Sequence, residues 1–124
     1  MTATIDALID EYTSRYIAGD AEGVTDLCLC PFLAIREGVP IHLADRGAIH
    51  DHFQAIMHAY RDAGYASFSP VAIDTRQLGE RAAFTTVRWH ARDVDGKVVR
   101  NTLTTYHLLA TRAGWRFLSY TNHF

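Results

Sequence analysis

The sequence has little of what several classes of protein need. Its 124 residues include two cysteines and three prolines, and the formal net charge is −2 at pH 7. Lysine and arginine do not gather into a stripe that could displace counterions from phosphates, so nucleic acid is not an expected partner. No apolar run approaches the ~18 residues that cross a bilayer, so we expect no membrane association. The residues that are present, 48% hydrophobic and 21% charged, are typical of a globular domain.

The two cysteines, Cys28 and Cys30, are one residue apart and fall in a segment that we expect to be helical. They cannot bridge each other there, and their spacing is not the C-x-x-C of redox or zinc sites. The first residues lack the charged and apolar regions of a secretory signal peptide. We therefore expect a reduced, cytoplasmic protein. No Gly-rich phosphate loop is found, and no cofactor is expected.

The first half of the chain repeats apolar residues at helical spacing. We expect a helix that Thr4 caps and Gly19 ends, followed by a shorter helix from Asp20 to Pro31. A third helix is expected to begin after Asp45. The buried stripes of the first and third helices are predicted at Ile5, Leu8, Ile9, Tyr12, Tyr16, Ile49, Phe53, Ile56, Met57 and Tyr60.

The rest of the chain has the character of strands. Two short strands, 32–37 and 39–43, are predicted around Gly38, and Pro40 confines the second to a sheet edge or a bulge. Three helices followed by a meander of long strands predict an α+β domain with one pocket between the helices and a curved sheet. The long strands, joined by turn signals such as Asp95-Gly96, are predicted at 65–78, 81–94, 97–111 and 115–124.

Three local features accompany this order of elements. Tyr12 stands eight residues before Asp20, residues 44–49 lead into the third helix, and Asp95-Gly96-Lys97 forms a hairpin turn. With these features, the chain resembles the nuclear transport factor 2-like superfamily, in its SnoaL-like and ketosteroid-isomerase-like branch. The resemblance implies a single domain over residues 1–124 with a cystatin-like cone, in which three N-terminal helices pack on a strongly curved mixed, mostly antiparallel sheet. It also implies a homodimer formed through the sheet face.

The ketosteroid isomerase pattern can be carried over at three positions. Tyr12 matches the first-helix tyrosine that serves that family as an oxyanion donor. Glu37 stands near the position of the general base, if a one-residue gap is allowed. Tyr106 stands where that family has a protonated aspartate as its second donor. Two of the three positions depart from the pattern, so isomerisation of 3-oxosteroids is not the expected reaction.

The hairpin around Asp95-Gly96 predicts which side chains face the pocket. A two-residue turn pairs Trp89 with Thr102, Val87 with Thr104 and Thr85 with Tyr106, all on one face, whereas a bulged turn would shift the pairing by one residue. The opposite face carries His90 and is expected to meet solvent or a second subunit. Together with the helix stripes, this predicts a pocket lined by Tyr16, Phe53, Met57, Val87, Trp89 and Thr104. The resemblance adds His123, which stands where this superfamily often closes the pocket mouth.

Histidines are the other candidate acid–base groups. His90 and His107 can exchange protons near neutral pH, although no carboxylate has an obvious place beside either ring. The third helix carries three more histidines, but helical spacing brings together only His58 and Asp62. Two ligands do not make a metal site, so we expect no bound metal and a solvated helix face.

Three functions are compatible with these features. The first is a proton-transfer enzyme (isomerase, cyclase or dehydratase) with Tyr12 and Tyr106 as hydrogen-bond donors and Glu37 or His90 as base. The second is a pocketed protein that binds a small apolar molecule without catalysis. The third is an interaction module that docks a partner through its sheet. We favour a small-molecule-binding domain whose catalytic status is open.

Overall fold

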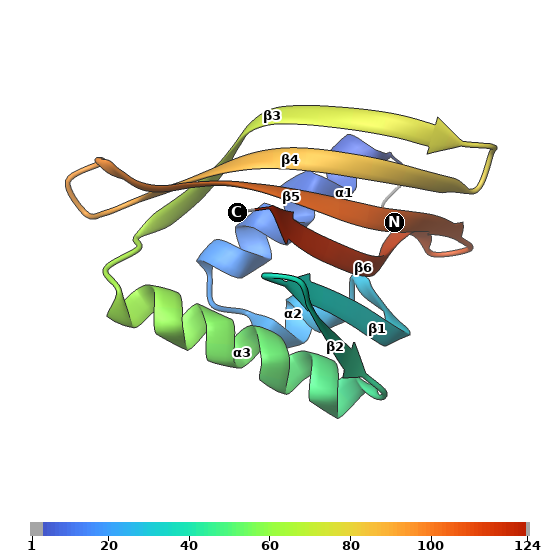
Figure 1. The fold of residues 1–124 in the computed structure, drawn as a ribbon, viewed down its shortest axis with the longest axis horizontal. Helices are drawn as coiled ribbons and strands as arrows, with labels where there is room; N and C mark the ends of the chain where they lie inside the picture. Colours follow the sequence, from blue (N-terminus) through green and yellow to red (C-terminus); the bar gives the residue numbers. More distant parts are fainter. Residues whose placement is uncertain (1–3, 124) are drawn as a thin grey trace.

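The computed structural model describes residues 4–123. Its three helices lie in the first half of the chain, and four long strands form the second half (Figure 1). The helices are α1 (Ile5–Ile17), α2 (Ala21–Thr25) and α3 (Arg46–Asp62), and the strands are β1 (Cys28–Arg36), β2 (Val39–Leu43), β3 (Ser67–Leu78), β4 (Ala82–Arg92), β5 (Val98–Thr111) and β6 (Gly114–His123). The last predicted strand reached Phe124, which lies outside the described residues.

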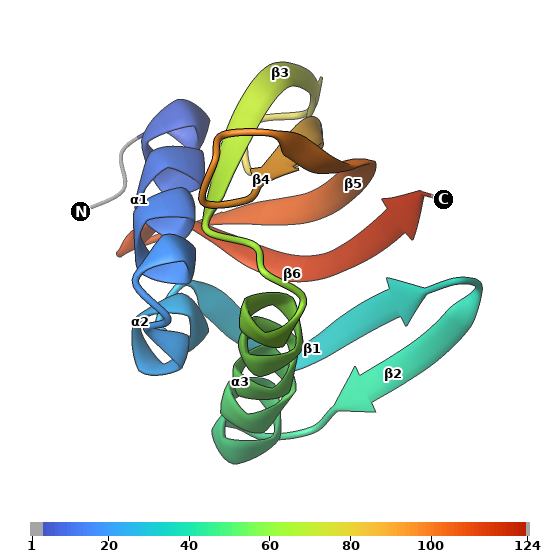
Figure 2. The same ribbon diagram turned by 90° about the vertical axis from the view of Figure 1, so that its left-hand side faces the viewer.

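The six strands form one mixed sheet in the order β2-β1-β6-β5-β4-β3. The pairing of β1 with β6 is parallel, and every other pairing is antiparallel. Figure 2 shows the helices gathered on one side of the curving sheet. The predicted α+β class, with three helices on a curved, mostly antiparallel sheet, is confirmed. Pro40 lies on β2, an edge strand of the sheet, as the sequence predicts.

The helices begin at the residues that the sequence indicates. The side chain of Thr4 accepts a hydrogen bond from the amide of Ala7, and Asp45 accepts one from the amide of Ala48. Such caps satisfy amides that have no partner within the helix. Gly19 has a φ of +70°, a conformation that glycine adopts without steric cost, and it turns the chain from α1 towards α2.

The prediction that the second helix runs to Pro31 is wrong. Helix α2 ends at Thr25, and Cys28 and Cys30 lie on β1. Strand pairing overrides the helical pattern, because β1 bonds to β6 on one side and to β2 on the other. Pro31 is tolerated because it lies where the β1–β6 register is broken, so the ladder needs no amide hydrogen there.

The pairing of β4 with β5 follows the predicted register. Trp89 pairs with Thr102, Val87 with Thr104, and Thr85 with Tyr106. The turn itself is longer than two residues, since the amide of Gly96 donates to the carbonyl oxygen of Asp93. A register shift between Ala91 and Arg92 compensates for this, so the predicted faces are confirmed.

The core fills the space between the helices and the inner face of the sheet. Ile49, Phe53 and Met57 of α3 are buried there, whereas Ile56 and Tyr60 of the same predicted stripe are only half-buried. Full burial of one large apolar side chain stabilises the fold by about 1.5–3 kcal/mol. The other large, fully buried side chains are Leu8, Ile9, Val24, Leu27, Phe32, Val87, Leu108 and Phe117.

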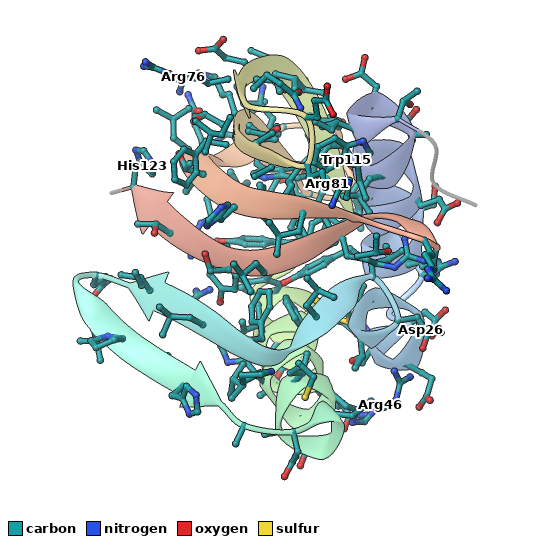
Figure 3. All side chains as sticks on the ribbon, turned by 90° about the vertical axis from the view of Figure 1, so that its right-hand side faces the viewer. Asp26, Arg46, Arg76, Arg81, Trp115 and His123 are labelled. Atoms are coloured by element: carbon teal, nitrogen blue, oxygen red, sulfur yellow. The ribbon has the colours of Figure 1, made fainter. Side chains whose placement is uncertain are left out.

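An exposed cluster of charges joins α2 to α3. The guanidinium of Arg46 donates to Glu22 at 3.0 Å and to Asp26 at 2.5 Å. Figure 3 shows Arg46 and Asp26 on the same side of the molecule. Exposed pairs of this kind contribute about 0–1 kcal/mol each, so this cluster adds little to stability.

No helix within residues 4–123 is long and apolar enough to cross a membrane.

Candidate ligand-binding cavity

A cavity of ≈ 70 Å³ lies between helices α1 and α3 and the inner face of the sheet. A single water molecule needs roughly 10–15 Å³ of such space, so the cavity has room for several waters or for a small organic molecule. Eight of its lining side chains are aromatic. The cavity is lined by Tyr12, Thr13, Tyr16, Arg36, Phe53, Ile56, Tyr60, Phe68, Trp89, Ala91, Arg100, Thr102, Thr104, Tyr106, Tyr120 and Asn122.

Six of the residues singled out from the sequence meet at this cavity. They come from α1, α3, β4 and β5, whose inner faces converge there. These residues are Tyr12, Tyr16, Phe53, Trp89, Thr104 and Tyr106.

Three residues predicted to line the cavity lie elsewhere. Val87 is fully buried in the core between the sheet and the helices. Met57 belongs to the same core and borders a second, smaller cavity of ≈ 40 Å³. His123 follows Asn122 on β6, and because neighbouring residues of a strand point to opposite faces, it turns away from the cavity. Its Nε2 lies 2.7 Å from the hydroxyl oxygen of Thr105 on the outer face.

The two candidate bases, Glu37 and His90, also lie away from the cavity. Glu37 is exposed in the turn between β1 and β2, with a φ of 52°. His90 lies between Trp89 and Ala91, which both line the cavity, so strand alternation places it on the outer face. Among the described residues that line the cavity, none is an aspartate, a glutamate or a histidine.

Arg36 is the lining residue that matters most among those the sequence analysis missed. It shares a face of β1 with Phe32 and Ala34, which are buried, so alternation along the strand brings its side chain inward. A charged residue continuing an apolar face was the signal that could have revealed it. Arg100 of β5 is a second such case, because it pairs with Ala91 of β4.

An uncharged group of hydroxyls lies at the α1 side of the cavity. The indole Nε1–H of Trp89 donates to the hydroxyl oxygen of Tyr106 at 3.1 Å. The rings of Tyr12 and Tyr106 pack edge to face, with their centroids 5.7 Å apart. Burial raises the pKa of both tyrosines well above the ordinary value, so both hydroxyls keep their protons. This group can donate hydrogen bonds but cannot act as a base near neutral pH.

A second group, centred on Tyr120, contains charge. The hydroxyl oxygen of Tyr120 accepts from Arg36 Nη1 at 3.2 Å and lies 2.6 Å from Nε2 of His52. Arg36 Nη2 donates to the Tyr60 hydroxyl at 3.5 Å. The guanidinium carbon of Arg100 stands 5.4 Å from the centroid of the Tyr60 ring, within the range of a cation–π contact. These contacts fix the Arg36 guanidinium at the cavity wall.

His52 is the second residue that sequence reasoning missed. It was assigned to a solvated helix face, yet it is half-buried and its ring packs against Phe53 and Tyr120. Burial, and then the positive charge of Arg36, lower the pKa of His52 below its ordinary value. The imidazole is therefore mostly neutral at pH 7.

Within residues 4–123, no three histidine, cysteine or acidic side chains are placed to hold a metal ion.

The fold is shared with solved structures of low sequence identity. A domain of unknown function from Nostoc punctiforme, described as having a cystatin-like fold, matches with a TM-score of 0.73 and 20% identity over 95% of this chain and 73% of that chain. An NTF2-like protein of unknown function from Shewanella oneidensis matches with a TM-score of 0.74 and 15% identity over 95% of this chain and 94% of its own. A Shewanella frigidimarina protein provisionally named as a ketosteroid isomerase matches with a TM-score of 0.71 and 15% identity, over 94% of this chain and 91% of that protein. These likenesses show that the chain has a cystatin-like fold.

The sequence itself identifies the family. The model of the NTF2-like protein (DUF6841) family matches residues 3–124. The chain therefore belongs to this family, and the resemblance inferred from the sequence is confirmed. Among curated proteins, none matches the chain significantly.

Proposed function

We propose that this protein binds a small organic anion, such as a short or aromatic carboxylate, in the cavity. One observation carries the proposal. Arg36 presents a half-buried positive charge to the cavity, its hydrogen-bond partners are the neutral hydroxyls of Tyr60 and Tyr120, and within the described residues no carboxylate forms an ion pair with it. Uncompensated buried charge is costly, and a ligand carboxylate would compensate it.

The chemistry of the wall fits the two parts of such a ligand. A guanidinium matches a carboxylate geometrically and can donate two parallel hydrogen bonds to it. The aromatic rings of Tyr16, Phe53 and Phe68 offer an apolar surface for the body of the ligand. This refines the apolar ligand expected from the sequence into one with an apolar body and an anionic head.

Binding without catalysis is the favoured form of this function. The two bases expected from the sequence, Glu37 and His90, do not line the cavity. A general base must come within hydrogen-bond reach of the proton that it removes. The neighbouring Tyr12 and Tyr106 support proton transfer as the second candidate, because two hydroxyl donors at the cavity could stabilise an oxyanion on a bound substrate.

Calorimetry with a matched pair of ligand series tests the proposal. Acetate, propionate, butyrate and benzoate are compared with their neutral amides near pH 7. We expect at least one carboxylate to bind more than tenfold tighter than its amide, because hydrogen bonds to charged groups contribute about 1.5–3 kcal/mol.

The variant Arg36→Met should remove this preference, since it keeps much of the side-chain volume and loses the charge. Arg76→Met is the control, because Arg76 is exposed on β3 (Figure 3) and the substitution changes the net charge equally. Equal affinity for carboxylates and amides, or full binding by Arg36→Met, would contradict the proposal.

We also propose a homodimer through the outer face of β4 and β5. The observation that supports it is an exposed aromatic ring, Phe84, which is 41% accessible on this face and stacks on His107 at 4.7 Å between centroids. Sedimentation should give roughly twice the chain mass of 13.9 kDa, and Phe84→Glu should shift it towards the monomer. A wild-type monomer at micromolar concentration would rule the dimer out. The cytoplasmic location and the single domain over residues 1–124 remain predictions.

A further inference from the structure

We propose that anion binding in the cavity is coupled to proton uptake by His52, which lies behind the cavity wall and sets the direction of the Tyr120 hydroxyl. The inference rests on the proposed function and adds to it the chemical state in which the site accepts its ligand. It makes the site one that captures an anion together with a proton.

Only one of the two residues lines the cavity, and the other lies behind it. Tyr120 of β6 lines the cavity, whereas His52 of α3 does not. Nε2 of His52 lies 2.6 Å from the Tyr120 hydroxyl oxygen, and the ring centroids are 5.9 Å apart. A separation of 2.6 Å between the two atoms is short for a hydrogen bond, so the state of one group determines what the other can do.

The direction of this hydrogen bond depends on whether Nε2 of His52 carries a proton. We assign to neutral His52 the tautomer protonated on Nδ1, in which Nε2 can only accept, so the Tyr120 hydroxyl donates to it. The single hydroxyl hydrogen of Tyr120 is then used on His52, while its oxygen accepts from Arg36 at 3.2 Å. Tyr120 therefore has no hydrogen to donate to a ligand. When His52 is protonated, Nε2–H donates to Tyr120, and the hydroxyl hydrogen is free to turn into the cavity. A carboxylate needs donors, so it is bound better by the protonated state.

The charges around His52 act in the same direction. The groups that face it are Arg36 from β1 and Tyr120 from β6, with Phe53 beside it on α3. The neighbouring carboxylate of Asp51 bonds to His50 instead, at 3.1 Å. Without a ligand, burial and the Arg36 charge lower the pKa of His52 and keep it neutral at pH 7. A carboxylate bound at Arg36 compensates that charge, so the pKa of His52 must rise on binding.

Linkage fixes the sign of the pH dependence. If binding takes up one proton, affinity falls by up to tenfold for each pH unit between the free and bound pKa values of His52. Affinity is highest below the free value, where His52 is already protonated, and it decreases as pH rises.

The experiment is an NMR titration of the His52 ring signals in the free protein and at saturating benzoate, with benzoate affinity measured from about pH 5 to about pH 8, around the ordinary histidine value of ~6.5. His52→Gln assigns the signals and retains a side chain that can bond to Tyr120 without titrating. His58→Gln, on the exposed side of the same helix, is the matched control.

We expect the His52 titration midpoint to rise on binding, and benzoate affinity to fall several-fold between about pH 6 and about pH 8, within the limit of tenfold per unit. The decrease of benzoate affinity with rising pH should be lost in His52→Gln and kept in His58→Gln. Benzoate binding with an unchanged His52 midpoint, or with the same slope in His52→Gln, would overturn the coupling while the anion site stands. Absence of binding by benzoate and the aliphatic carboxylates at every pH would overturn both. The NMR shift is read on the wild-type protein, so it does not depend on the variant folding.

Discussion

The two polar groups of the cavity are built around the same residue type and behave differently. Tyr106 is hydrogen-bonded to Trp89 and packs against Tyr12, which are both neutral, whereas Tyr120 is hydrogen-bonded to Arg36 and His52, which carry or can take up charge. Burial is the main cause that raises the pKa of both tyrosines, but the Arg36 charge opposes it only at Tyr120 among these two. We infer that the Tyr106 side of the cavity supports the fold, and we propose that the Tyr120 side recognises charge.

The largest expected effect is the loss of the ring on the uncharged side. Tyr106→Ala removes a side chain that is 3% exposed and leaves a cavity in the core. Aromatic-to-alanine substitutions in cores cost about 3–5 kcal/mol. Urea unfolding should show this loss in the free energy of unfolding. Phe84→Ala, on the outer face of the same sheet, should cost much less. A loss below about 1 kcal/mol for Tyr106→Ala would remove the distinction between the two sides.

A smaller effect is expected from removing single hydroxyls. Tyr106→Phe leaves the Trp89 Nε1–H without its acceptor, which should cost about 1–3 kcal/mol of stability. Tyr120→Phe should cost less, because Arg36 and His52 are half-buried and can turn towards water. It should instead weaken carboxylate binding. Thermal unfolding and calorimetry on both variants measure the contrast, and the reverse order of stabilities would contradict it.

The smallest effect appears only in alkaline solution. The pKa values of Tyr12 and Tyr106 are raised in the folded protein, so the unfolded chain loses its tyrosine protons first as pH rises. The contribution of these two tyrosines to the free energy of unfolding therefore does not change with pH near neutrality. It decreases above pH ~10, the ordinary tyrosine pKa. Absorbance of tyrosinate should show a late-ionising class that appears together with unfolding. Ionisation of all six tyrosines near the ordinary value, with the fold intact, would show that this side is open to water.

Much of the architecture could be predicted because local signals and the final packing agree. Thr4 and Asp45 cap helices as expected, and the Asp95-Gly96 turn gave the correct faces for Trp89 and Tyr106. The segment from Cys28 to Pro31 could not be predicted from local pattern, because its conformation depends on pairing with β6 about 90 residues away in the chain.

The site was harder to predict than the fold. The aromatic wall follows from helix stripes and strand alternation, and Tyr12, Phe53 and Trp89 line the cavity. Arg36 was missed because its charge was read as a sign of exposure despite its place on an apolar strand face, and His52 because it looks like a surface residue of its helix. Their roles depend on Tyr120, which contacts both from a third element. Only the tertiary fold brings these three together.

A crystal structure of the protein soaked with benzoate would show directly whether Arg36 binds the carboxylate of a ligand in the cavity. We expect the benzoate carboxylate to lie within about 3.2 Å of the Arg36 guanidinium, and the benzoate ring to lie among the aromatic side chains of the cavity. A benzoate ring in the cavity with its carboxylate turned away from Arg36, or a cavity closed by side chains and empty of ligand at saturating benzoate, would contradict it.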